Sequence, residues 1–248
     1  MIVIRALKDI GSYFLMLKRV FSGFTKGSIL RELIFKEIDD LIIGSLGIVS
    51  FISFFVGGVI AIQTALNLDN PLIPKALIGF ATRQSMILEF APTFISIIMA
   101  GKMGSFITSS IGSMRVTEQI DALDVMGINS LNYLVFPKVI ALLFFPFVIA
   151  LSMFLGIFGG FLAGVYGGFT SAGDFVSGLQ DSFDPFHLTY AFIKTFVFAF
   201  ILATVPSWQG YYMKGGALEV GKASTNSFVW TSVLIILTNY IITTLLLS

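Results

Sequence analysis

Residues 139–166 read VIALLFFPFVIALSMFLGIFGGFLAGVY and contain no charged side chain. A helix of about 20 apolar residues is long enough to cross the hydrocarbon core of a bilayer. This stretch exceeds that minimum, and a longer apolar helix can cross the bilayer with tilt. The sequence therefore predicts a membrane-spanning helix at 139–166.

The whole chain is unusually apolar for its length. Of its 248 residues, 56% are hydrophobic, 27 are Phe and only 12% are charged, whereas a soluble domain carries about 25% charged residues. The sequence has no Cys and a single His, His187, which excludes disulfides, thiolate metal sites and multi-histidine metal sites. A formal net charge of +1 argues against a nucleic-acid partner, which would need a basic surface. We expect an integral membrane protein with no metal site.

Five stretches are long and apolar enough to span a bilayer. They cover residues 41–66, 85–101, 139–166, 190–208 and 228–247. The expected fold is an all-α integral membrane protein, in which an N-terminal segment at 1–40 precedes a five-span domain at 41–248.

The N-terminal segment mixes basic and apolar residues. Arg5, Lys8, Lys18 and Arg19 flank the apolar run around Phe14, a pattern typical of an amphipathic helix that lies in the membrane interface. A soluble amphipathic helix packed on a partner protein is the alternative.

Lys and Arg are distributed unevenly among the segments outside the predicted spans. The tail at 1–40 has seven, 102–138 has three and 209–227 has two, against only Lys75 and Arg83 on the opposite side. Because cytoplasmic segments are enriched in Lys and Arg, we expect a cytoplasmic N-terminus. Five spans then place the C-terminus on the opposite side of the membrane, outside the cytoplasm; the family resemblance described below makes that side the periplasm.

Glycine recurs every four residues along the third span. Gly156, Gly160, Gly164 and Gly168 would form one bare stripe along a helix, and such stripes allow helices to approach closely in lipid. We therefore predict that these four glycines pack against another helix.

The densest group of charges lies between the second and third spans, in GSMRVTEQIDALDVMGINSLNYLVFPK at 112–138. If 116–126 is a helix, Glu118, Asp121 and Asp124 share one face. The apolar side chains lie on the opposite face: Val116, Ile120 and Leu123. The segment thus predicts a short amphipathic helix outside the bilayer.

Boundary signals fit such a helix. Thr117 is a candidate N-cap, Gly127 a candidate C-terminal residue, and Pro137 a candidate start of the third span. Two interpretations remain at this point. The acidic face either meets a partner, or the segment is a solvated loop whose charges keep it out of the bilayer.

A longer stretch around this segment carries a family resemblance. Residues 101–141, GKMGSFITSSIGSMRVTEQIDALDVMGINSLNYLVFPKVIA, resemble the signature of the MlaE/YrbE permease family. In that signature a small-residue segment leads into M-R-[AV]-T-E-Q-[IL]-x-[AS]-[LM], then Met, a small residue, an apolar stretch and P-[RK]. The matching residues are Gly101, Gly104, Gly112, Met114 to Gln119, Leu123, Met126, Pro137 and Lys138. A looser resemblance runs from about residue 30 to the end of the chain.

This resemblance implies a permease subunit of an ABC transporter in bacterial lipid trafficking. It implies an inner-membrane homodimer that binds a cytoplasmic ATPase carrying ATP and Mg, a periplasmic MCE-domain protein and a small STAS-type regulatory protein. The segment between spans two and three then becomes the coupling helix. The residues expected to couple it to the ATPase are Arg115, Glu118, Gln119, Asp121 and Asp124. The sequence contains no G-x-x-x-x-G-K-[ST] motif, so we expect no nucleotide site and no cofactor on this chain.

The resemblance also implies a lipid-binding cavity. The expected lining residues are Glu89, Ile60, Gln63 and Leu66. For Ile60, Gln63 and Leu66, an ordinary contact between helices is the alternative. The family usually has R-E-L-G-P where this chain has LEFAP at 88–92, so Leu88 stands in place of the family's arginine. Arg83 or Lys194 would have to replace it as the partner of a phosphate, or the cargo is another hydrophobic molecule.

Two ionisable residues fall inside predicted spans, where a charge near the bilayer centre costs about 2.5–3.5 kcal/mol. Glu89 lines the cavity, forms a structural ion pair, or is protonated. Lys194 lies near the end of the fourth predicted span, and we expect its ammonium group to reach the membrane interface.

Two other classes of function fit less well. A self-contained, ion-coupled secondary transporter of a hydrophobic solute would need internal repeats and several paired intramembrane acids. An intramembrane enzyme would need a nucleophile with a base, paired Asp residues or a metal cluster. The sequence offers one convincing intramembrane acid and places His187 in an external loop. A permease driven by a separate ATPase is therefore the preferred interpretation.

Overall fold

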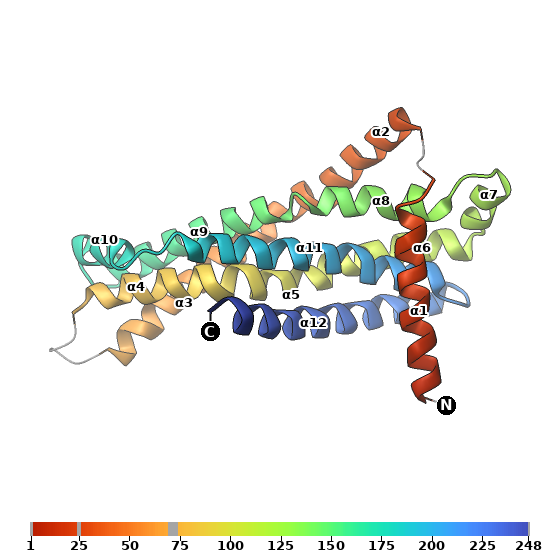
Figure 1. Cartoon of the computed structure of the whole chain (residues 1–248). Coiled ribbons are helices and arrows are strands. Elements are labelled where there is room, and N and C mark those ends of the chain that lie inside the picture. Colours follow the sequence, from red (N-terminus) through yellow and green to blue (C-terminus); the bar gives the residue numbers. More distant parts are fainter. Residues whose placement is uncertain (1, 24–25, 69–73, 248) are drawn as a thin grey trace. The chain divides into compact units, whose positions relative to one another are not determined.

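The computed structural model describes residues 2–23, 26–68 and 74–247, and every regular element among them is a helix (Figure 1). Five helical stretches are long and apolar enough to cross a membrane. The prediction of an all-α integral membrane protein with five spans is confirmed. The stretches are Gly27–Asn67, Ala76–Val116, Ser130–Tyr166, Phe186–Tyr212 and Ala217–Leu247.

These stretches are longer than predicted. The first begins at Gly27 rather than at residue 41, and the third at Ser130 rather than at residue 139. Glu37 and Lys138 lie in the parts of these two stretches that precede the predicted spans, and they form an ion pair with each other in which both side chains are largely buried. A charged side chain with an oppositely charged partner can lie within a membrane-spanning helix, whereas an unpaired charged side chain favours the membrane surface.

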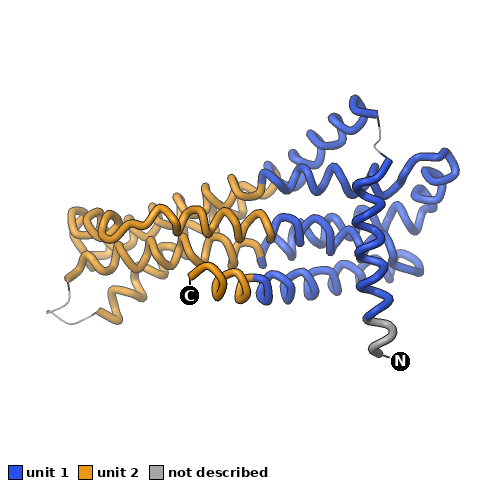
Figure 2. The backbone as a smooth tube through the Cα atoms, in the orientation of Figure 1, with its two compact units in different colours: residues 1–43, 97–144, 198–238 blue, residues 44–96, 145–197, 239–248 orange. Residues whose placement is uncertain are grey.

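The chain divides into two compact units, which Figure 2 colours separately. Unit 1 contains residues 1–43, 97–144 and 198–238, and unit 2 contains residues 44–96, 145–197 and 239–248.

Unit 2 is built on the pair formed by α3 (Gly44–Asn67) and α9 (Phe145–Tyr166). A Cβ atom on Gly57 would overlap the carbonyl group of Gly156, and one on Gly159 would overlap the carbonyl group of Phe54. The two backbones are therefore in direct contact, which is how helices gain dispersion energy in lipid. A buried hydrogen bond of 2.7 Å between the Ser53 and Ser152 hydroxyls joins the same two helices.

The predicted glycine stripe is shorter than expected. Gly156, Gly160 and Gly164 are buried on α9, but Gly168 lies beyond the end of that helix. Its φ is +76° and no atom lies within 4 Å of the position of its Cβ. Gly168 therefore allows the chain to turn after α9 and does not extend the packing stripe.

At one end of unit 2, α4 (Ala76–Ser85) packs against α10 (Ala172–Gln180). Here too the contact depends on glycine, because a Cβ on Gly178 would overlap the Ala76 carbonyl. Ser171 begins α10 as its N-cap, accepting a hydrogen bond of 3.0 Å from the Asp174 amide. A small apolar core centred on Phe175 lies beneath.

Unit 1 contains α1 (Ile2–Val20), α2 (Gly27–Glu37) and α8 (Ser130–Leu142). Figure 1 shows α1 crossing the later part of α11 (Phe186–Tyr212) at a steep angle. The Tyr13 hydroxyl lies 2.7 Å from Thr204 Oγ1, and Trp208 Nε1 donates to Ser12 Oγ at 2.9 Å. Burial raises the pKa of the Tyr13 phenol, so this group stays protonated and can donate.

The opposite side of α1 is apolar and open. Its exposed large residues are Leu7, Ile10, Phe14 and Leu15. A helix that crosses a membrane-spanning helix steeply, with one apolar face uncovered, has the geometry of an interfacial helix. The arrangement supports the interfacial interpretation, because the covered face of α1 packs on its own chain.

Within residues 2–23, 26–68 and 74–247, three segments have the wider π-helical turn: η1 (Ile38–Ile43), η2 (Met86–Phe94) and η3 (Ala100–Gly104). The short α5 (Ile95–Met99) separates the last two. Pro92 lies inside η2; it has no backbone N–H, and its ring would clash with the preceding turn of an α-helix. Single wide turns inside α-helices occur often at functional sites.

The second span ends in α6 (Ser105–Val116), which packs within unit 1 against residues 198–212 of α11 and the beginning of α12 (Ala217–Leu247). Thr108 Oγ1 donates to the Pro206 carbonyl at 3.0 Å. Ser224 Oγ donates to the Ser105 carbonyl at 3.2 Å. These contacts position the polypeptide that follows α6.

Candidate functional site

Two groups of residues are candidates for function, and each lies within one unit. The first is the segment between spans two and three that was predicted to be a coupling helix, named the coupling segment here; it covers residues 117–128 in unit 1 and ends before Asn129, the N-cap of α8. The second is the Glu89–Lys194 cluster in unit 2.

The coupling segment contains one short helix, α7 (Gln119–Val125). Glu118 precedes it with a left-handed φ of +58°, a conformation uncommon for any residue except glycine. Gly127 follows it with a φ of +75°. The Gly127 amide bonds to the Asp124 carbonyl and the Ile128 amide to the Leu123 carbonyl, both at 3.0 Å, which is the Schellman pattern of a helix C-terminus.

The predicted boundaries of this helix are partly wrong. It covers 119–125 instead of 116–126, because Thr117 Oγ1 bonds back to the Ser113 carbonyl at 2.9 Å at the end of α6 and Glu118 turns the chain. Pro137 does not begin the third span; it lies inside α8, whose N-cap is Asn129. Gly127 ends the short helix as predicted.

The side chains of α7 and of the residues directly after it differ in burial and in chemical character. Ile120 is fully buried, while Asp121 and Asp124 are exposed. Val125 is 89% exposed and Met126 is 65% exposed. The segment therefore presents an apolar tip beside its acidic residues, a feature that the predicted division into one apolar and one acidic face did not contain.

Arg115 braces the coupling segment from α6. Its Nη1 atom is 2.8 Å from Asp121 Oδ1, and its guanidinium carbon lies 5.6 Å from the centre of the Tyr211 ring. The Tyr211 hydroxyl is 2.9 Å from Ser130 Oγ at the start of α8. Gln119 Nε2 donates to Thr117 Oγ1 at 3.0 Å. Arg115 and Gln119 thus hold the shape of the segment, while Glu118 and Asp124 face outward.

In unit 2, Lys194 is fully buried and forms an ion pair with Glu89, whose side chain is 43% exposed. Lys194 Nζ lies 3.0 Å from Glu89 Oε1, 3.1 Å from the Leu88 carbonyl and 2.8 Å from the Tyr190 hydroxyl. All three donor positions of the ammonium are used. The expectation that Lys194 reaches the membrane interface is wrong, because protein oxygens surround it.

The other carboxylate oxygen of Glu89 completes the cluster. Asn239 Nδ2 donates to Glu89 Oε2 at 3.1 Å, and the Thr93 hydroxyl lies 3.1 Å from the same oxygen. Tyr190 bonds to Thr243 Oγ1 at 2.7 Å, and Thr243 bonds to the Asn239 carbonyl at 2.7 Å. A continuous network therefore joins α11, α12 and η2 within unit 2.

The sequence contained a signal for this network that was not used. Tyr190 and Lys194 are four residues apart on α11, as are Asn239 and Thr243 on α12. Side chains at that spacing share a helix face, so two polar pairs in otherwise apolar helices could have indicated one shared polar contact.

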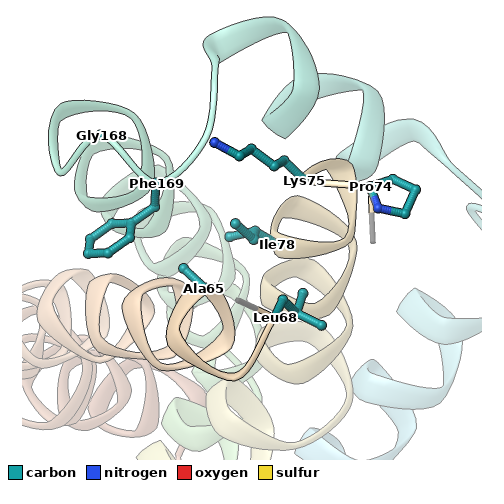
Figure 3. A pocket seen from close by; sticks show the side chains of 7 residues that line it. All are labelled: Ala65, Leu68, Pro74, Lys75, Ile78, Gly168 and Phe169. Atoms are coloured by element: carbon teal, nitrogen blue, oxygen red, sulfur yellow. The ribbon is translucent and has the colours of Figure 1, made fainter. Parts of the chain in front are cut away.

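The other residues predicted to line a lipid cavity, Ile60, Gln63 and Leu66, lie on α3 and not in this cluster, and they differ from one another in exposure. Ile60 is buried on α3, whereas Gln63 and Leu66 are exposed on the same helix. Two hollows within unit 2 contain none of these residues. One, of about 250 Å³, is lined by Phe54, Phe55, Gly58, Val59, Ile62, Gly159, Leu162 and Ala163. The other, of about 220 Å³, is shown in Figure 3 and lined by Ala65, Leu68, Pro74, Lys75, Ile78, Gly168 and Phe169.

Arg83 does not take the place of the family's missing arginine. It is buried between the rings of Phe80 and Phe183, whose centres lie 5.1 and 5.6 Å from its guanidinium carbon. Its Nη1 atom donates to the carbonyls of Leu179 at 2.6 Å and Asp181 at 2.9 Å. Arg83 therefore satisfies the carbonyl groups at the end of α10.

Comparison with known proteins identifies the family. The family model described as Permease MlaE matches residues 34–245. The chain belongs to this family. A probable ABC transporter permease protein of Rickettsia bellii is 33% identical over 245 residues, covering 98% of this chain and 93% of the relative.

More distant relatives extend the comparison. The Intermembrane phospholipid transport system permease protein MlaE of Haemophilus influenzae is 27% identical over 86% of this chain and 82% of its own length. The chloroplastic protein TRIGALACTOSYLDIACYLGLYCEROL 1 of Arabidopsis thaliana is 31% identical over 80% of this chain and 57% of its own length. The predicted family is thus confirmed, and this MlaE-family chain is a multi-pass membrane permease subunit.

Proposed function

We propose that this permease is the membrane-spanning subunit of an ABC transporter that moves phospholipid, or a similar hydrophobic molecule, between a bacterial inner membrane and a periplasmic MCE-domain protein. The observation that carries the proposal is the coupling segment, which exposes an acidic and apolar surface between two membrane spans of an MlaE-family chain. Two copies of the chain would form the transport pathway, and a small STAS-type protein would regulate the assembly from the cytoplasm.

The coupling segment fits a protein partner. Val125 and Met126 are apolar and exposed, and Glu118, Asp121 and Asp124 are exposed in the same short segment, where Asp121 pairs with Arg115. An apolar anchor inside a polar rim is typical of a protein–protein contact. We therefore expect the partner to offer an apolar pocket with basic residues at its edge. ATP and Mg would bind to that partner, since this sequence lacks a phosphate-binding loop.

The Glu89–Lys194 cluster bears on the cargo. Both Arg83 and Lys194 are engaged by protein oxygens, so neither supplies a ready partner for a lipid phosphate. The Glu89 side chain is 43% exposed, but its carboxylate is already paired with Lys194. The cluster is therefore internally paired, and the proposed cargo is a phospholipid or a similar hydrophobic molecule irrespective of its headgroup. Gln63 and Leu66, exposed on α3, would face the acyl chains together with Ile60 at the edge of the same surface.

Reversing the charge of Glu118 is expected to remove ATP-dependent transport. Glu118→Lys places a positive charge against the basic rim, and because juxtaposed like charges cost several kcal/mol, we expect at least about tenfold weaker binding of the ATPase. Binding of the ATPase and transfer of labelled phospholipids with ethanolamine and glycerol headgroups are measured in reconstituted vesicles. Glu32→Lys, the same change at an exposed position of α2, is the matched control and should transport normally.

Transport measured in the same vesicles also distinguishes the proposed permease from a secondary transporter. A chain that transports without any ATPase, along an ion gradient, would be a secondary transporter and would overturn the proposal. Equal transport by Glu118→Lys and by the native chain would remove the coupling segment from the mechanism.

The charge distribution predicts the direction in which the chain crosses the membrane. With twelve Lys and Arg residues on one side and two on the other, a reporter that is active only in the periplasm should be active when fused to the C-terminus. Fused after residue 127 in the coupling segment, it should be inactive. A reporter active in the cytoplasm when placed at the C-terminus contradicts the five-span orientation.

A further inference from the structure

Two asparagines at the N-terminus of α8, directly after the coupling segment, hold the C-terminus of α1. Asn129 Nδ2 donates to the carbonyls of Arg19 at 2.9 Å and Ser22 at 2.6 Å. Asn132 Nδ2 donates to the Val20 carbonyl at 2.7 Å. The last carbonyls of a helix have no partner within the helix. Here side chains more than a hundred residues later in the sequence supply those partners.

Asn129 joins two helices through the two ends of one amide. Its Oδ1 atom accepts a hydrogen bond of 3.3 Å from the Asn132 backbone amide, which makes Asn129 the N-cap of α8. Its Nδ2 atom bonds to the end of α1. The same side chain therefore fixes where α8 begins and where α1 ends.

A short and hydrogen-bonded connection joins Asn129 to α7. Only residues 126–128 lie between the last residue of α7 and Asn129, and the amides of Gly127 and Ile128 both bond to carbonyls of α7. A displacement of α7 is therefore carried directly to Asn129. On the other side of the contact, the rings of Phe21 and Phe136 meet edge to face with centres 5.9 Å apart.

We propose that Asn129 and Asn132 are positioning residues that make α1 move together with the coupling segment when the ATPase acts on α7. This inference rests on the proposed function of the chain. Each transport cycle then shifts an amphipathic helix, whose apolar residues Phe14 and Leu15 are exposed, within the membrane surface. By this proposal α1 changes its position during transport and does not only attach the chain to the membrane surface.

Distances between spin labels test the joint movement directly. The chain has no Cys, so cysteines introduced at Lys18 on α1, Ala122 on α7 and Leu218 on α12 can be labelled in pairs, and all three positions are exposed. The complex with the ATPase is measured in nanodiscs, without nucleotide and trapped with ATP and vanadate. We expect the distances 18–218 and 122–218 to change and the distance 18–122 to stay constant. A changed 18–122 distance, or no change in either distance to residue 218, overturns the inference.

A substitution at Asn129 tests the functional role. Asn129→Asp keeps an oxygen that can cap α8 but places a carboxylate oxygen against the two carbonyls of α1. The variant should bind the ATPase and hydrolyse ATP normally, while the lipid transferred per ATP falls at least about fivefold. Asn226→Asp, at an exposed site on α12, is the matched control.

The two proposals fail in different ways. A native complex that shows no ATP-dependent transport contradicts the proposed function itself. A native complex that transports, with an Asn129→Asp variant that transfers as much lipid per ATP, contradicts only the role of the asparagines.

Discussion

Replacing Glu89 by alanine is expected to lower the free energy of unfolding by about 3 kcal/mol, and adding Lys194→Met is expected to restore most of this loss. The single change leaves the fully buried Lys194 without its carboxylate. Breaking a buried ion pair on one side costs about 3–5 kcal/mol, and we take the lower end because Glu89 is partly exposed. The measurement is thermal unfolding in detergent, where we expect a decrease of about 6–12 °C for the single variant.

An exposed pair of the same type provides the control for this prediction. Glu219 and Lys222 form an ion pair on α12 in which both side chains are well exposed. Glu219→Ala should change the stability by less than about 1 kcal/mol, as is usual for surface pairs. If the double variant with Glu89→Ala and Lys194→Met is as unstable as the Glu89→Ala variant, the loss of stability does not come from leaving the Lys194 ammonium group unpaired.

Adding one methyl group at Gly57 is expected to destabilise the protein by at least about 3 kcal/mol. The new Cβ would overlap the backbone carbonyl of Gly156, and backbone atoms cannot rotate away as a side chain does. Gly57→Ala would therefore force α3 and α9 apart along their contact, which exceeds ordinary overpacking. The yield of folded protein and the unfolding temperature in detergent both report this change.

The same helix contains a matched position. Gly47 also lies on α3, but no atom lies within 4 Å of the position of its Cβ. Gly47→Ala should therefore leave the stability unchanged or raise it by up to about 1 kcal/mol, because alanine favours helix more than glycine does. Equal stability of the Gly57→Ala and Gly47→Ala variants would contradict the close contact between the two helices.

The sequence was sufficient for features that depend on local composition. Apolar length identified all five spans, and Gly127 identified the end of the short helix between spans two and three. Both signals act over a few neighbouring residues. The starts of the first and third helical stretches were less accurate, because the ion pair between Glu37 and Lys138, which lies before both predicted spans, joins residues 101 positions apart in the sequence.

Features that depend on distant partners could not be read in the same way. The burial of Lys194 follows from Glu89 and Tyr190, and its position in the sequence alone indicated a span end. The π-helical segments η2 and η3 also change the angular spacing of side chains within the second span. A regular period of 3.6 residues therefore assigns the wrong face to residues beyond them.

The pairing of Glu89 with Lys194 has a consequence for biogenesis. The carboxylate is synthesised first, and the ammonium that neutralises it follows 105 residues later. At a synthesis rate of about 5–20 residues per second, the second hydrophobic segment waits about 5–20 s for its counter-ion. During that interval the carboxylate lacks its counter-ion, so we expect the nascent polypeptide to be most vulnerable to degradation before its fourth hydrophobic segment leaves the ribosome.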